Sequence, residues 1–132
     1  MSGIEVNGLD EVLKKLKKLP EKVQKRVLVG AVRAGAKPII KEAKRLVPVR
    51  TGTLKKSIGV VKRRSKNKNL IHFTVTPRKK KGGWYAHYVE FGTLKMSARP
   101  FMRPAYEKEG ENSIKFVREY MKKRVDKEIA KL

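Results

Sequence analysis

The chain has 132 residues, of which 39% are apolar, and it carries a formal net charge of +23 without a single cysteine. This length and apolar content predict one domain covering residues 1–132, with a modest hydrophobic core. The lack of cysteine excludes a disulfide framework, a thiol nucleophile and a cysteine-ligated metal site, and it fits a reducing compartment.

The opening segment, MSGIEVNG, has neither the basic nor the apolar part of a secretory signal peptide. The apolar stretches of the chain are too short to span a membrane. We therefore expect the protein to be made and used in the cytoplasm of its host unless a larger particle carries it out.

The first third of the chain is predicted to be mainly helical. Residues 4–6 suit a short strand, and apolar side chains recur at helical spacing over residues 9–19. A second, longer helix is expected over residues 20–46, with a proline in its first turn. Pro38 predicts a kink or a break inside this helix, and Pro48 ends it.

The middle third changes to the alternation that is typical of strands. Residues 58–61 and 71–75 predict two strands, and residues 65–69 between them have the polar composition of a hairpin loop. The basic residues 78–81 are expected to form a second loop. Residues 84–91 suit a helical turn or a strand, and we favour the strand.

The last third is predicted to be one helix, with Pro100 and Pro104 flanking its start and Gly110 as a point of interruption. Together these elements predict the α+β class. We expect a small antiparallel β-sheet packed against two long α-helices, with a short N-terminal helix.

The sequence shows no recognisable catalytic, cofactor-binding or metal-binding motif. His72 and His87 lack partners at metal-ligand spacing, and no serine lies in a nucleophile elbow. Glu107, Glu109 and Glu111 alternate, a spacing that scatters them around a helix. We therefore predict a protein that is not an enzyme and needs no cofactor or metal.

The positive charge is concentrated between Glu42 and Glu90, where 14 Lys or Arg occur without an acid. Such clusters attract polyanions, and neighbouring aromatic residues could stack on bases; the other interpretation is a solvated loop that keeps the protein soluble. The candidate polyanion contacts are Lys62, Arg63, Arg64, Lys66 and Lys68 in one cluster and Arg78, Lys79, Lys80 and Lys81 in the other.

Three short motifs follow one another in a characteristic order. They are VPVRTGTLKKSI at residues 47–58, YAHYVEFGT at residues 85–93 and ARPFMRPA at residues 98–105. With the opening IEVNGLDEVLKKLKKLP, they resemble a tail-component family of long-tailed bacteriophages and prophages. Gene product ten of a Hong Kong lambdoid phage typifies this family. The resemblance covers nearly the whole chain, and the high basic charge is its main departure from the pattern.

The resemblance implies a structural virion protein of the tail or neck, active in head–tail joining or tail completion. It implies partners among other tail or neck proteins, and a homo-oligomer, often a ring of six, around the DNA channel. The family-motif residues in this chain are Pro48, Arg50, Thr51, Gly52, Leu54, Ser57, Tyr85, Val89, Glu90, Gly92, Thr93, Pro100, Phe101 and Pro104.

Physical roles for some motif residues follow from their chemistry. Gly52 suits a turn, and Gly92 allows the chain to turn before Phe101 docks the last helix. Glu90 is the only acid between Glu42 and Glu107, so we predict that it pairs with an arginine, Arg50 being the first choice. For all of these residues we favour maintenance of the fold over direct contact with a partner.

A second class of function stays open at this point, a non-specific nucleic-acid-binding protein that uses the basic loops 62–68 and 78–81. A ring protein should form or join oligomers, whereas a DNA binder should show a steep dependence on salt and little self-association.

Overall fold

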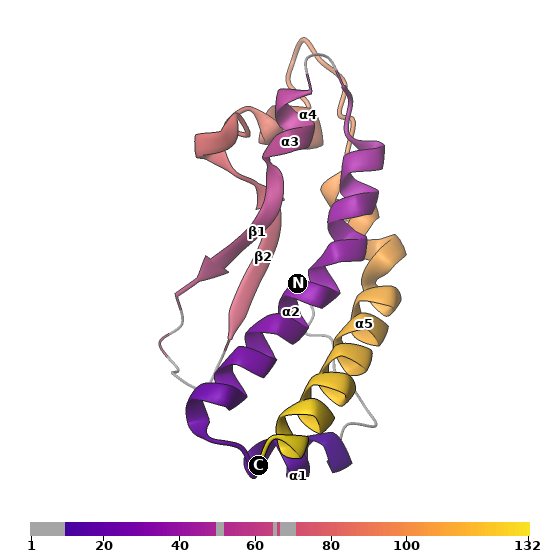
Figure 1. Cartoon of the computed structure of the whole chain (residues 1–132). Coiled ribbons are helices and arrows are strands. Elements are labelled where there is room, and N and C mark those ends of the chain that lie inside the picture. Colours follow the sequence, from indigo (N-terminus) through magenta and orange to yellow (C-terminus); the bar gives the residue numbers. More distant parts are fainter. Residues whose placement is uncertain (1–9, 50–51, 65, 67–70) are drawn as a thin grey trace. The chain divides into compact units, whose positions relative to one another are not determined.

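A computed structural model of the chain describes residues 10–49, 52–64, 66 and 71–132. The predicted N-terminal strand and most of the predicted hairpin loop lie outside these residues. The elements in chain order are α1 (Asp10–Lys17), α2 (Glu21–Leu46), α3 (Thr53–Ser57), β1 (Ile58–Arg63), β2 (His72–Pro77), the 3₁₀ turn η1 (Lys79–Lys81), α4 (Ala86–Phe91) and α5 (Met102–Ala130), as Figure 1 shows.

The predicted α+β class is confirmed, because an antiparallel pair of strands accompanies two long helices and a short N-terminal helix. The chain divides into two compact units. Met1–Gly35 with Glu111–Leu132 form one, which we call the helical unit, and Ala36–Gly110 form the other, which we call the mixed unit. Both α2 and α5 contribute to both units. No helix among the described residues is both long and apolar enough to span a membrane.

The helical unit has its own core where α1, the first part of α2 and the last part of α5 meet. Two glycines of α2 allow α5 to approach closely: a Cβ at Gly30 would overlap the hydroxyl of Tyr120, and one at Gly35 would lie 2.6 Å from Val117. The buried side chains are Leu16, Leu19, Val27, Ala31, Met121 and Val125.

The mixed unit has a second core, which joins the sheet to the helices. The end of α2, the start of α5, α3 and both strands contribute side chains to it. Phe101, immediately before α5, is completely buried and is the largest of them. The buried residues are Ala36, Ile39, Ala43, Val47, Leu54, Ile58, Val75, Phe101 and Ala105.

The outer edge of β2 is covered by a side chain of α5. Val60 and Val75 face each other in the antiparallel register, and the Tyr106 hydroxyl bonds both backbone groups of Val75. The Val75 N–H donates to this oxygen at 3.0 Å, and the hydroxyl donates to the Val75 carbonyl at 3.0 Å. Burial raises the pKa of the Tyr106 phenol, so the hydroxyl keeps the proton that it donates. The side chain thereby fastens the hairpin to α5.

A carboxylate joins α2 to α5 inside the mixed unit. Glu42 on α2 is buried, and Arg45 donates to both of its oxygens while Lys108 of α5 donates to Oε1 at 3.2 Å. The hydrogen bonds from Arg45 lower the pKa of the Glu42 carboxyl from 4.5 to about 2, with help from Lys108 and against the effect of burial.

Four predictions from the sequence are corrected. Of the kink or break predicted at Pro38, the break is absent, because α2 continues through this residue and its neighbours Ala36 and Ile39 pack in the core. Residues 86–91 form a helix and not the favoured strand. The predicted loop at 78–81 contains a 3₁₀ turn. Gly110 likewise lies inside a continuous α5.

We predict that Tyr106→Phe lowers the free energy of unfolding by about 1–3 kcal/mol, because it leaves two backbone groups of Val75 without their partner. Urea denaturation followed by circular dichroism measures the change. The matched control is Tyr88→Phe, which removes an exposed hydroxyl and should change stability by less than about 0.5 kcal/mol. Equal stabilities of the two variants would contradict the role of Tyr106.

The lowered pKa of Glu42 predicts an acid-sensitive stability. Because the folded value is about 2 and the usual value is 4.5, unfolding takes up a proton between these pH values. The contribution of Glu42 is therefore complete above pH 4.5 and is lost as the pH falls toward 2. Glu42→Gln should flatten this acid limb in urea denaturation at a series of pH values. Glu107→Gln, at an exposed ion pair with Arg103, should leave the limb unchanged.

Candidate functional site

Helix α4 has two different faces. Tyr85, Ala86 and Val89 point to the core of the mixed unit, and Tyr85 stacks edge-on with Trp84 at 5.4 Å. Tyr88 and Phe91, one helical turn apart, are exposed, as is Trp84 before the helix. The side chains of Phe91 and Trp84 are 80% and 64% exposed. Helix α4 therefore packs one apolar face against the core and presents large apolar side chains to solvent on the other.

The segment after α4 adds to this exposed apolar surface. Gly92 has a φ of 78°, and a Cβ there would lie 2.8 Å from the Ala98 nitrogen, so the turn requires glycine. Thr93 and Met96 then exchange two backbone hydrogen bonds, of 2.8 and 3.3 Å, which leave Leu94 and Lys95 at the tip of a tight turn. Leu94 is completely exposed. We call Trp84, Tyr88, Phe91, Leu94 and Met96 the α4–turn surface.

Glu90 fixes this segment to the start of α5. Its Oε2 accepts hydrogen bonds from the backbone N–H groups of Phe101, at 2.8 Å, and Met102, at 3.1 Å, and its Oε1 accepts one from Arg103 at 3.1 Å. The next residue, Pro104, has no N–H. The four backbone positions that lack an intrahelical acceptor at a helix start are thus all accounted for. The N–H of Arg99 also donates to the Val89 carbonyl at 2.8 Å.

The described partners of Glu90 are therefore backbone amides and not an arginine. Arg50, the predicted partner, lies outside the described residues, and that pairing stays a prediction. The sequence contained a signal for the observed arrangement, since Phe101 offers no side-chain acceptor for the helix that it precedes. Without the tertiary structure, nothing identified Glu90 as the group that supplies this acceptor.

The other family-motif residues lie mainly in the core and turns of the mixed unit. Leu54 and Ser57 are buried in α3, where the Ser57 hydroxyl donates to the Leu54 carbonyl. Gly52, with a φ of 83°, precedes this helix. Pro48 follows α2 and is half-buried, Pro104 lies in the first turn of α5, Pro100 and Thr93 are exposed, and Thr51 lies outside the described residues.

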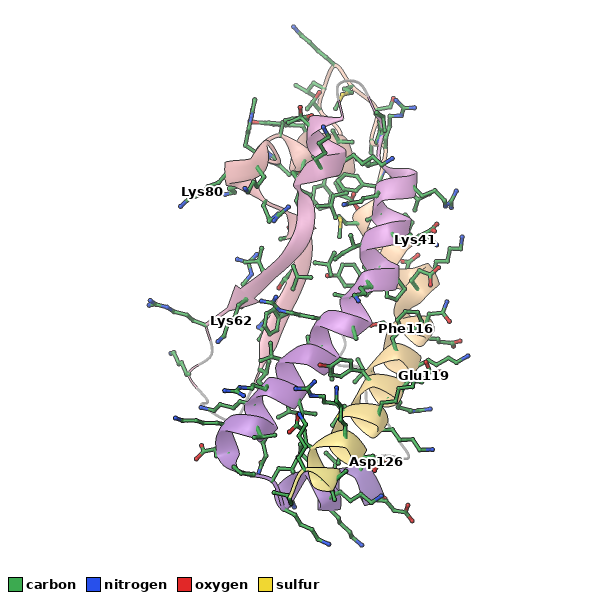
Figure 2. The ribbon with its side chains drawn as sticks, in the orientation of Figure 1. Lys41, Lys62, Lys80, Phe116, Glu119 and Asp126 are labelled. Carbon is green, nitrogen blue, oxygen red and sulfur yellow. The ribbon has the colours of Figure 1, made fainter. Side chains whose placement is uncertain are left out.

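The two basic clusters lie at opposite ends of the hairpin. Arg63 is paired with His72, whereas Ile58 is paired with Pro77 just before η1. Five register steps of ~3.4 Å separate these ends by roughly 17 Å. The clusters therefore do not form a single patch. Lys62, Arg63, Arg64 and Lys66 are exposed, as are Lys79, Lys80 and Lys81, while Lys68 lies outside the described residues. Figure 2 labels Lys62 on the hairpin and Lys80 on η1, well apart from each other.

Arg78 is distinguished by its two hydrogen bonds to backbone carbonyls of α3. Its Nε donates to the Ser57 carbonyl at 3.0 Å, and its Nη2 donates to the Lys56 carbonyl at 3.3 Å. These carbonyls belong to the end of α3, where a cation is favourable. A Cβ on Gly59 would lie 2.9 Å from the Arg78 guanidinium, so glycine leaves room for it. Arg78 is thus half-buried and holds α3 against the start of η1.

The described residues offer no grouping of metal ligands. No three His, Asp or Glu within residues 10–49, 52–64, 66 and 71–132 come together to hold a metal ion. His87 packs against the ring of Tyr88 at 3.9 Å and is exposed. What the mixed unit offers is a surface of apolar side chains beside cations, which suits binding to another macromolecule.

Residues 10–92 match the model of the HK97-gp10-like family, described as "Bacteriophage HK97-gp10, putative tail-component", and the chain belongs to this family of phage tail components. No curated protein and no solved structure matches the chain significantly.

We predict that Glu90→Gln lowers the free energy of unfolding by about 2 kcal/mol, because the amide keeps one acceptor but loses the charge that strengthens all three bonds. Urea denaturation measures this change, and hydrogen exchange should show faster exchange at Met102 and Arg103. Glu107→Gln is the matched control, one turn into the same helix, and should have an effect below about 0.5 kcal/mol. An effect of Glu90→Gln no larger than that of the control would exclude the proposed cap.

Proposed function

We propose that the chain acts as a structural component of the virion tail or neck, in head–tail joining or tail completion, by assembling into or onto a ring around the DNA channel. The family supplies the tail-component role. The observation that carries the assembly step is the α4–turn surface, where five large apolar side chains are exposed within a segment of 13 residues. Burying such side chains against another protein is favourable by about 25 cal/mol per Å² of apolar area.

The proposed role also fits the way in which the motifs are used. Glu90, Gly92 and Phe101 hold the exposed segment in one conformation, which lowers the entropy that binding would otherwise lose. The motif residues thereby act on the partner indirectly, by maintaining the fold that presents the surface. Catalysis has no part in this proposal.

A second candidate function is non-specific nucleic-acid binding. The observation that favours it is the exposure of Lys79, Lys80 and Lys81 on η1, in a chain of net charge +23. If duplex DNA neutralises these three lysines, replacing them with alanine should reduce the slope of log affinity against log salt by about 2.7. An unchanged slope would remove η1 from any DNA contact.

Light scattering distinguishes the two functions. The purified chain is measured at low and at about 150 mM salt, with and without duplex DNA. A closed oligomer that persists at the higher salt is the result that the assembly role predicts. A monomer that binds DNA tightly at the higher salt would contradict it and favour the second candidate. A monomer whose DNA binding disappears there excludes the second candidate and leaves assembly dependent on a partner.

A further inference from the structure

The mixed unit is strongly positive, and its few acids all have partners within the chain. Ala36–Gly110 contain 20 of the 35 Lys and Arg but only four of the 12 Asp and Glu. Glu42 is bonded to Arg45 and Lys108, Glu90 to the amides of α5, and Glu107 to Arg103, and Glu109 is also engaged. The negative charge at an interface with this unit would therefore come mainly from the other molecule.

Cations lie within the exposed apolar segment itself. Lys95 is at the tip of the turn beside Leu94, and Arg99 is exposed where the segment returns to α5. Glu90 is the only acid between residues 84 and 99, and both of its oxygens are occupied. An occupant of this surface has to offer apolar side chains to Phe91 and Leu94 and carboxylates to Lys95 and Arg99.

We propose that the α4–turn surface is the docking site for an acidic segment of a different tail protein, one that carries apolar side chains between its carboxylates. This inference rests on the proposed assembly role and names the chemistry of the partner. Lys95 and Arg99 would pair with carboxylates at the rim, while Phe91 and Leu94 are buried at the centre, the arrangement of charge and apolar area that is common in protein interfaces.

A second copy of the chain fits this surface poorly. Two copies joined through the same face would bring cations together without an acid between them. The helical unit does not supply the missing charge either, since its described residues include 15 Lys and Arg against seven Asp and Glu. Contacts between copies therefore use other faces, or follow the arrival of the acidic partner.

Nucleic acid also fits it less well than an acidic protein does. DNA and RNA offer phosphates to Lys95 and Arg99 and base faces to Trp84, but stacking on bases needs flat aromatic groups. Leu94 and Met96 are aliphatic and gain from contact with other apolar side chains. The mixture of aliphatic and aromatic groups thus favours a protein.

The single tryptophan of the chain, Trp84, reports directly on this surface. The full chain is titrated at about 150 mM salt with three synthetic peptides of equal length. The first alternates Asp or Glu with Leu or Phe, the second has the same acids with serine in place of the apolar residues, and the third has the same apolar residues with lysine in place of the acids. The first peptide should bind at least about tenfold more tightly than the others and shift the Trp84 emission to the blue. Equal binding of the first two peptides, or of the first and third, would overturn the proposal.

The variant Phe91→Ser with Leu94→Ser should weaken binding of the first peptide about tenfold. The matched control is Phe116→Ser with Leu132→Ser, which replaces two exposed apolar side chains of the helical unit and should leave binding unchanged. Circular dichroism checks that both variants are folded.

The same variant tests the other occupants. If the unmodified chain forms an oligomer that the Phe91→Ser, Leu94→Ser variant cannot form, the surface binds a second copy and the proposal is wrong. If the variant binds duplex DNA more weakly than the unmodified chain does, the surface binds nucleic acid and the proposal is also wrong. An oligomer that persists while all peptides bind equally overturns this inference but not the assembly role.

Discussion

The carboxylate of Glu90 accepts the backbone hydrogen bonds at the start of α5, where Phe101 has no side-chain acceptor of its own. Phe101 occupies the position before the helix, where a serine or aspartate would usually accept hydrogen bonds, but its ring fills the core of the mixed unit instead. Glu90 supplies the acceptor from α4, and Pro104 removes the last N–H that would need one. One ionised side chain thus allows a fully apolar residue to enter the core at the start of a 29-residue helix.

This interaction also determines the conformation of the segment between α4 and α5. The chain leaves Phe91 through Gly92, closes the turn between Thr93 and Met96, and returns to α5 at Phe101. Because both ends are fixed, the apolar side chains of the turn point to solvent and cannot enter the core, which Phe101, Leu54 and Ile58 already fill. The core and the exposed surface are therefore two consequences of the same constraint. The excess of cations in the mixed unit adds an electrostatic preference to that surface.

The sequence predicted the elements whose apolar pattern is long and regular. α1, α2 and α5 follow from apolar residues at helical spacing, and the two strands follow from short segments in which apolar and polar residues mix over residues 58–61 and 71–75. The sequence does not identify α4, because the apolar and aromatic residues of 84–91 fit a helical turn and a strand equally well. Its helical form depends on Tyr85 and Val89 reaching the core together, which is a tertiary effect.

The candidate site was less predictable, for similar physical reasons. The importance of Glu90 followed from its isolation in a basic region, but its partners are backbone amides 11 to 13 residues away, which no side-chain pattern reveals. No pattern in the sequence indicates that the Tyr106 hydroxyl bonds the edge of β2. Arg78 was grouped with the neighbouring lysines by charge, whereas its geometry assigns it to the end of α3. The exposure of Leu94 depends on the turn that follows Gly92.

Hydrogen–deuterium exchange of the free chain and of the same chain within assembled tails tests the central claim most directly. The account predicts that the amides of Phe101, Met102 and Arg103 are already protected in the free chain, because Glu90 accepts their hydrogen bonds. It predicts fast exchange at residues 94 and 97 in the free chain and strong protection of the same residues in the tail. Unchanged exchange of this turn upon assembly, or fast exchange at residues 101–103 in the free chain, would contradict it.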